Sequence, residues 1–81
     1  MKLRVQFFSR LRDVTGSEYL DLEIKAGATA NDLLAELFAR FPKLREWERN
    51  ILIGAGVEFV ERDYVLKEDD EISIMPPVQG G

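Results

Sequence analysis

The chain has 81 residues, 46% of them apolar and 32% charged, which is typical of a folded globular domain and excludes a disordered or collagen-like chain. A chain of this length forms one domain that buries about 60 to 65% of the surface exposed by the unfolded chain, so its core is small. The net charge of −4 has the wrong sign for a phosphate backbone, and we expect no nucleic-acid partner.

Cysteine and histidine are both absent from the sequence. The chain therefore lacks a thiol nucleophile, the commonest general base and the commonest metal ligand of proteins. Catalysis within the chain would depend on carboxylates, lysines or hydroxyls, so we expect no independent catalysis and no bound metal or cofactor. No apolar run is long enough to span a membrane and the N-terminus lacks the apolar region of a secretory signal, which makes the cytoplasm the default compartment and predicts no membrane partner.

Two strands are predicted at the start of the chain. KLRVQFF alternates Leu3, Val5 and Phe7 with polar residues, the period-two pattern of a strand with one buried face. SRLRDVTGS is interpreted as a connection in which Gly16 and its polar neighbours favour a turn. EYLDLEI alternates again, and because strands joined by a short connection usually pair, we expect a β-hairpin.

A helix is predicted next. Thr29 and Asp32 match a capping box, in which each side chain accepts a hydrogen bond from a free backbone N–H of the first turn. Apolar residues then recur along one helical face: Leu33, Leu34, Leu37, Phe38 and Phe41. Pro42 ends the helix. KLREWERN is read either as a short helical turn that places Trp47 against the core or as an irregular charged loop.

Three short strands are predicted in the last third of the chain, in ILIGAG, VEFV and EISIM, with the charged, turn-rich segment ERDYVLKEDD before the last of them. The order is then two strands, a helix and three strands. Strands gathered around a single long helix predict an α+β fold, with one mixed sheet of about five strands and the helix across one face.

Apolar residues also fall on the face of this sheet that points away from the helix. If Leu3, Val5 and Phe7 point at the helix, Phe8 projects from the opposite side, and if Ile72 and Ile74 point at it, so does Met75. Phe59 lies on the same face only if its neighbour Val60 points toward the helix, and the alternation does not decide which of the two does. Single exposed apolar residues are common, whereas a cluster on an open sheet face marks a protein partner, and the pattern does not decide between the two.

The domain is expected to span residues 1–75 and to be followed by a protruding tail, PPVQGG, over residues 76–81. Pro76 and Pro77 lack N–H donors, so they end sheet pairing and direct the chain outward in an extended form.

Beyond the prolines, Val78 and Gln79 can make side-chain or backbone contacts, and Gly80 and Gly81 can pass through a channel too narrow for any other residue. The α-carboxylate expected at Gly81 is ionised at neutral pH and is a poor electrophile. Reaction with ATP would convert it into an acyl adenylate, from which a sulfur or nitrogen nucleophile could displace AMP. A thiocarboxylate at Gly81 is the one plausible carrier of sulfur in a chain without cysteine, and every catalytic group would come from partners.

The order of elements and the motifs FFSRLRDVTG, ATANDLLAELFARFP and PPVQGG resemble those of the ubiquitin-like β-grasp sulfur carriers, in particular the small subunits of molybdopterin synthase. The resemblance covers essentially the whole chain. Its most specific part is the PPVQGG ending, since many unrelated functions share the β-grasp fold.

The resemblance implies a sequence of reactions at Gly81. An E1-like adenylyltransferase that uses ATP adenylates the carboxylate, and a sulfur-donating sulfurtransferase provides the sulfur of a thiocarboxylate. The tail, Pro76, Pro77, Val78, Gln79 and Gly80 with Gly81 at its tip, then enters the active site of the synthase large subunit. There it donates sulfur to cyclic pyranopterin monophosphate. Two small and two large subunits are expected in the complex.

The resemblance also implies contact residues. The apolar interface positions of the family fall on Phe8, Phe59 and Met75, and Arg12 matches the arginine of the N-terminal motif and is a candidate partner contact.

This chain departs from the family pattern at two turns. Asp69 stands where the family commonly has glycine before the last strand, and Gly56 stands where it commonly has asparagine. Both substitutions suit a turn. The acidic run from Glu68 to Glu71 is interpreted as a solvated turn or, alternatively, as a contact for a basic partner surface.

Three other functions remain open from the sequence. A sulfur carrier for thiamine or tRNA thiolation would use the same chemistry with a different acceptor, although thiamine-type carriers usually lack the double proline. A ubiquitin-like protein modifier would join Gly81 to lysines of other proteins. An interaction module would use the domain alone, with an inert tail.

Overall fold

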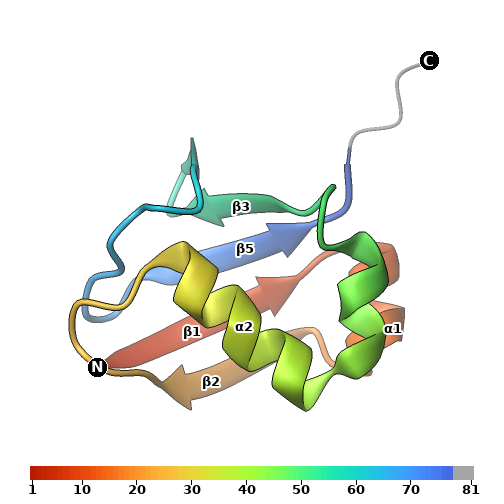
Figure 1. The fold of residues 1–81 in the computed structure, drawn as a ribbon, viewed down its shortest axis with the longest axis horizontal. Helices are drawn as coiled ribbons and strands as arrows, with labels where there is room; N and C mark the ends of the chain where they lie inside the picture. The colour runs from red at the N-terminus through yellow and green to blue at the C-terminus, as the bar shows by residue number, and fades with distance from the viewer. Residues whose placement is uncertain (78–81) are drawn as a thin grey trace.

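The computed structural model describes residues 1–77, so the predictions for Val78, Gln79, Gly80 and Gly81 lie outside the described residues. Within residues 1–77 the elements follow in the order β1 (Lys2–Phe7), α1 (Arg10–Thr15), β2 (Tyr19–Glu23), α2 (Ala30–Arg40), the 3-10 helix η1 (Pro42–Trp47), β3 (Leu52–Ala55), β4 (Glu58–Val60) and β5 (Glu71–Met75). Figure 1 shows them along the chain.

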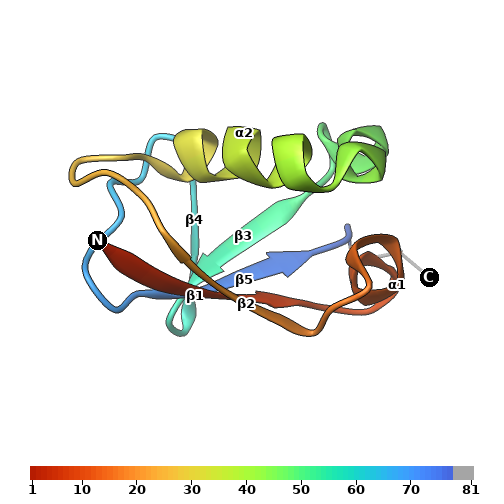
Figure 2. The same cartoon turned by 90° about the horizontal axis from the view of Figure 1, so that it is seen from below.

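The strands form one five-stranded sheet in the order β2-β1-β5-β3-β4. β1 and β5 run parallel in its centre, and every other neighbouring pair is antiparallel. α2 lies across one face of the sheet, as Figure 2 shows from the side. The predicted α+β fold, a ubiquitin-like β-grasp with one main helix on a mixed sheet, is confirmed, as is the antiparallel pairing of β1 with β2.

The core lies between α2 and the two central strands. Val5 and Phe7 of β1 and Ile74 of β5 have no exposed surface, and the predicted apolar face of α2 is buried against them. Burying one such side chain contributes about 1.5–3 kcal/mol to folding. Phe7 also meets the ring of Phe41 edge to face, with 5.8 Å between the ring centroids. Alternate residues of β1 and β5 therefore point into the core and the others point to the opposite face.

The predicted capping box is present at the start of α2. The Asp32 backbone N–H donates to Thr29 Oγ1 at 3.3 Å, and the Thr29 backbone N–H donates to Asp32 Oδ2 at 2.9 Å. The second of these bonds lowers the pKa of the Asp32 carboxyl, because the hydrogen bond favours the charged form. Its contribution to stability is therefore present at neutral pH and is lost as the pH falls through the lowered pKa.

The stretch SRLRDVTGS was predicted to be a connection, and this prediction is wrong: residues 10–15 form the helix α1. Leu11 and Thr15 lie one turn apart and are both buried, and Thr15 Oγ1 donates to the Leu11 carbonyl at 2.9 Å. Gly16 adopts φ 74° and ends the helix, and its backbone N–H donates a hydrogen bond to the Arg12 carbonyl. Only the turn at Gly16 was predicted correctly, because a two-turn helix offers too few apolar positions to establish a period.

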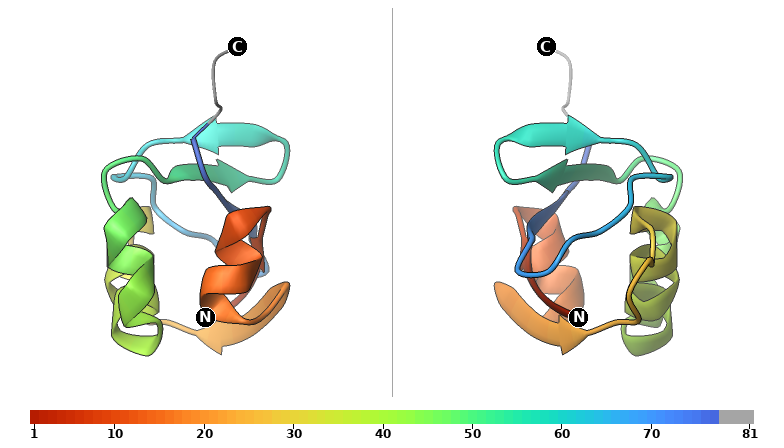
Figure 3. Two further views of the ribbon diagram at one scale, coloured as in Figure 1. Left: turned by 90° about the vertical axis from the view of Figure 1, so that its right-hand side faces the viewer. Right: turned by 90° about the vertical axis from the view of Figure 1, so that its left-hand side faces the viewer.

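The segment after α2 is the short helical turn rather than the irregular loop. Leu44 of η1 is fully buried, and Trp47 packs half-buried against the core. η1 contacts α1, and Figure 3 shows the two close together at one end of the sheet. This end is the one at which β1 and β5 finish.

The turn before β5 is made without glycine. Asp69 has φ 66°, in the left-handed region, and its N–H donates to the Lys2 carbonyl at 2.9 Å. Asp70 Oδ2 accepts hydrogen bonds from the Lys67 N–H at 2.8 Å and the Tyr64 hydroxyl at 3.0 Å. Partial burial, followed by the Asp70 carboxylate, raises the pKa of Tyr64, so its hydroxyl stays a donor. Asp70, within the acidic run, thus holds the turn together.

We predict that Asp69→Gly raises the free energy of unfolding, by about 0.5 kcal/mol, because glycine adopts a positive φ without the clash that an L side chain meets. Asp63, which stands in another exposed turn and has an ordinary negative φ, is the matched control. Asp63→Gly is expected to lower the free energy of unfolding by a similar amount. Urea denaturation measures both, and equal losses for the two variants would contradict the strain at Asp69.

Candidate functional site

The sheet face opposite α2 is apolar where β5 ends. Strand register places Leu52 opposite Met75, and Gly54 lies between Ser73 on one side and Phe59 on the other. Directly paired residues share a face, so all five lie on the open face. Phe59 is 70% exposed, and Leu52 and Met75 are half-buried. None of these side chains belongs to the buried core cluster.

Phe8 extends this apolar area. Its backbone N–H donates to the Ile74 carbonyl at 3.1 Å, which continues the parallel pairing one residue beyond β1. Because Phe7 pairs with Ile74, Phe8 lies level with Met75 and alternates away from the core. We call Phe8, Leu52, Phe59 and Met75 the apolar patch.

The structure also settles which way β4 faces. Val60 packs against the core, and Phe59 therefore points to the open face, which the alternation alone left undecided. Leu52 was not predicted to belong to the patch. Leu52 stands in the apolar run ILIGAG, whose pattern predicts that every residue is buried. Only its spacing of two residues from Gly54, which puts both on one face of the strand, could have revealed that it lies on the open face.

Pro76 and Pro77 follow the patch directly. β5 ends at Met75, and the two prolines lie outside the sheet and are half-buried. The root of the tail therefore adjoins the apolar patch, whereas the residues beyond Pro77, including the proposed reactive carboxylate of Gly81, lie outside the described residues.

Arg12 lies on α1 and not on the sheet. Its side chain is exposed and forms no ion pair with any of residues 1–77, and α1 begins two residues after Phe8. Ser9, between them, has φ 55° and ψ −131°, a conformation that side chains disfavour. This bend turns the chain from the patch directly into the helix that carries Arg12.

The other half of the open face is charged. Arg4 Nε donates to Asp21 Oδ1 at 3.0 Å, and the Arg4 guanidinium also lies over the Tyr19 ring, 5.4 Å from its centroid. Hydrogen bonding to Arg4 lowers the pKa of Asp21. Both side chains are well exposed, so solvent screens the pair and it contributes little to stability.

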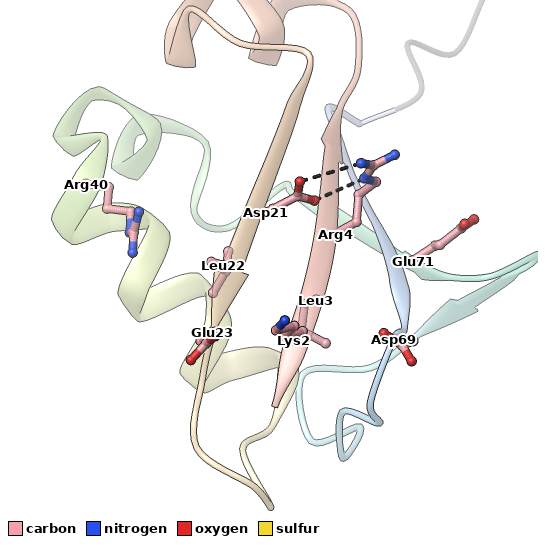
Figure 4. A pocket seen from close by; sticks show the side chains of 9 residues that line it. All are labelled: Lys2, Leu3, Arg4, Asp21, Leu22, Glu23, Arg40, Asp69 and Glu71. Atoms are coloured by element: carbon pink, nitrogen blue, oxygen red, sulfur yellow. Dashed lines mark hydrogen bonds and ion pairs between the residues drawn. The ribbon is translucent and has the colours of Figure 1, made fainter.

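A hollow of about 730 Å³ lies beside these charged residues and reaches round to Arg40 of α2, as Figure 4 shows. Basic and acidic side chains alternate around it: Lys2, Arg4 and Arg40 with Asp21, Glu23, Asp69 and Glu71. Within residues 1–77, no three acidic side chains come close enough together to hold a metal ion. Because opposite charges are interspersed among its lining residues, this hollow has no cluster of one charge that would mark a ligand site. It also lies away from the apolar patch and the tail root.

No helix among the described residues is long and apolar enough to cross a membrane.

The sequence model of the ThiS family matches residues 5–81, almost the whole chain. The chain belongs to the ThiS family. The molybdopterin synthase sulfur carrier subunit of Arabidopsis thaliana is 31% identical over 81 residues, which cover all of this chain and 84% of the plant protein.

Solved structures of similar proteins have the same fold as this chain. The molybdopterin converting factor, subunit 1, of Pyrococcus furiosus has a TM-score of 0.88 at 28% identity, over 96% of this chain and 99% of that one. Subunit 1 in the complex of subunits 1 and 2 of the molybdopterin-converting factor of Helicobacter pylori has a TM-score of 0.72 at 26% identity, with full coverage of both chains. The small archaeal modifier protein 1 of Methanosarcina acetivorans has a TM-score of 0.81 at 28% identity, over 99% of this chain and 96% of that one.

The facing of β4 can be tested with two neighbouring substitutions. We predict that Phe59→Asp changes the free energy of unfolding by less than about 1 kcal/mol, because Phe59 is exposed. Val60→Asp is expected to cost about 2 kcal/mol or more, because it places a carboxylate against the core. Chemical denaturation of both variants checks this, and a larger loss at position 59 than at position 60 would reverse the assignment.

Proposed function

We propose that this chain is the sulfur-carrier subunit of a molybdopterin synthase. The observation that carries the proposal is the position of the apolar patch beside Pro76, the root of the tail that ends in Gly80 and Gly81. The plant relative that carries this name and the structural likeness to converting factor subunit 1 support it. The absence of cysteine and histidine also suits a role in which partner enzymes supply the catalytic groups.

In the proposed reaction, an oxygen of the Gly81 carboxylate attacks the α-phosphate of ATP and releases pyrophosphate. An E1-like adenylyltransferase provides the site for this step. Hydrosulfide released by a sulfurtransferase then attacks the acyl carbon and displaces AMP, which leaves a thiocarboxylate at Gly81. The thiocarboxylate delivers its sulfur to cyclic pyranopterin monophosphate, and an oxygen from water restores the carboxylate. Because the activation consumes ATP, we place the protein in the cytoplasm.

The large subunit would lie over the apolar patch. Burying apolar side chains such as Phe59 provides affinity, while the prolines project the tail from the same edge toward the partner's active site. Arg12, exposed on the adjoining α1, is free to contact the rim of the same interface. The Helicobacter pylori complex, which joins subunits 1 and 2, supports a partner of this kind, and two copies of each subunit are expected.

We predict that incubation with the cognate adenylyltransferase, ATP and a sulfur donor adds the mass of one oxygen-to-sulfur exchange to the C-terminus. Intact-mass spectrometry with fragmentation locates the change to Gly81. A variant that lacks Gly81 is the control and should stay unchanged. If a known sulfur carrier gains sulfur in the same mixture and this chain does not, the sulfur-carrier function is contradicted.

The likeness to the small archaeal modifier protein 1 favours a second candidate, a protein modifier. In that case the activated Gly81 would form an isopeptide bond with lysines of other proteins. Conjugates isolated from cells through a tag on the N-terminus would support this function, and their absence beside an abundant thiocarboxylate would exclude it. A sulfur carrier for thiamine or tRNA thiolation would differ only in its acceptor, which a sulfur-transfer assay with each acceptor distinguishes.

A further inference from the structure

A small hollow lies within the apolar face beside the tail root. It has a volume of about 170 Å³ and is lined by Gly54, Gly56, Val57, Glu58, Phe59, Ser73 and Met75. Most of the lining surface is apolar. The hollow is the part of the patch between β3, β4 and the end of β5, and it opens to solvent on the face opposite α2.

Gly54 forms the floor of this hollow because it has no side chain. A Cβ at this position would lie 3.4 Å from Met75 Cε, 3.4 Å from the Ser73 Cβ and 3.6 Å from the Glu58 carbonyl oxygen. These distances are at the short end of ordinary contact, and the nearest side-chain atom is the flexible end of Met75, so the buried position 54 accommodates a Cβ. Gly54 also has an ordinary backbone conformation, since its φ is not positive. Backbone geometry therefore does not require glycine here, and a methyl group fits in place of its hydrogen.

Glycine inside a strand costs stability relative to residues with side chains, so its presence at an unrestrained position calls for another reason. The side chains around it provide one. Phe59 is 70% exposed and Val57 is fully exposed, and together with Met75 they form walls around a floor without a side chain. The arrangement is a shallow, open hollow in the apolar surface, which we call the socket.

We propose that this socket receives one apolar side chain of the protein that accepts the tail, and that Gly54 determines how deeply it enters. This inference rests on the proposed function, in which that protein is the synthase large subunit. At roughly 30 Å³ for each water-sized group, the volume holds about five or six non-hydrogen atoms. It therefore fits one aliphatic side chain of the size of leucine or methionine, and not two.

The position of the socket identifies its occupant. Met75, which lines the socket, is bonded directly to Pro76, so a protein that binds the tail down to its root lies beside the socket. The patch around it supplies the neutral apolar contacts that exclude water from a central anchor, as in other interfaces dominated by a few buried side chains. Two polar residues also line the socket: Ser73 lies beside Gly54 and is half-buried, and Glu58 is exposed and keeps contact with water.

We expect Gly54→Ala and Gly54→Val to weaken binding of the purified large subunit in a graded way, by a few-fold and by about tenfold or more, because each fills more of the socket. Calorimetric titration of the large subunit measures the change. Gly54→Ala should unfold at the same urea concentration as the unsubstituted chain or a higher one, since it replaces a strand glycine and its Cβ is accommodated. Gln6→Ala, on the same sheet face but outside the socket, should bind unchanged.

The outcomes separate the two proposals. Unchanged affinity of Gly54→Val, in a titration where the unsubstituted chain binds, would overturn the socket and leave the carrier function standing. If the unsubstituted chain does not bind the large subunit and gains no sulfur at Gly81, the carrier function itself is overturned. If Gly54→Val shows an earlier urea transition, the affinity of Gly54→Ala decides, and unchanged affinity of a fully folded Gly54→Ala would overturn the socket.

Discussion

The parallel pairing of β1 with β5 is the constraint on which the rest of the structure depends. It joins the start of the chain to its end, with Phe7 opposite Ile74, and both side chains are completely buried beneath α2. Because parallel strands finish at the same edge, the residues that follow them also meet. Phe8 and Met75 therefore lie level with each other on the open face, and Pro76 leaves the sheet from this point.

A central strand gives the tail a fixed root. β5 is hydrogen-bonded on both sides, to β1 and to β3, so the position of Met75 and Pro76 is set by the most buried part of the sheet. Pairing with β3 and β4 adds Leu52 and Phe59 beside Met75. The fold thus brings the apolar patch and the start of the tail together, and in the proposed function the chemistry at Gly81 is done by the partner enzymes.

The sequence was sufficient wherever a pattern was long or chemically specific. The capping box at Thr29 and Asp32 and the apolar face of α2 were predicted correctly, because eleven helical residues repeat one face several times. α1 was missed because its six residues offer only Leu11 and Thr15 as buried positions. The patch was predicted in part: Phe8 and Met75 break the alternation of their strands, whereas Leu52 stands in a run that is apolar throughout.

Figure 2 shows that α2 covers one face of the sheet and leaves the other open, and the central claim is that partners dock on this open face at the end of β5. Amide hydrogen exchange of the chain with and without the synthase large subunit tests this claim most directly. We predict slower exchange in residues 52–59 and 73–75 and at Phe8, with no change in α2 or in β2. Slower exchange confined to α2 or to the outer edge of β2 would contradict it.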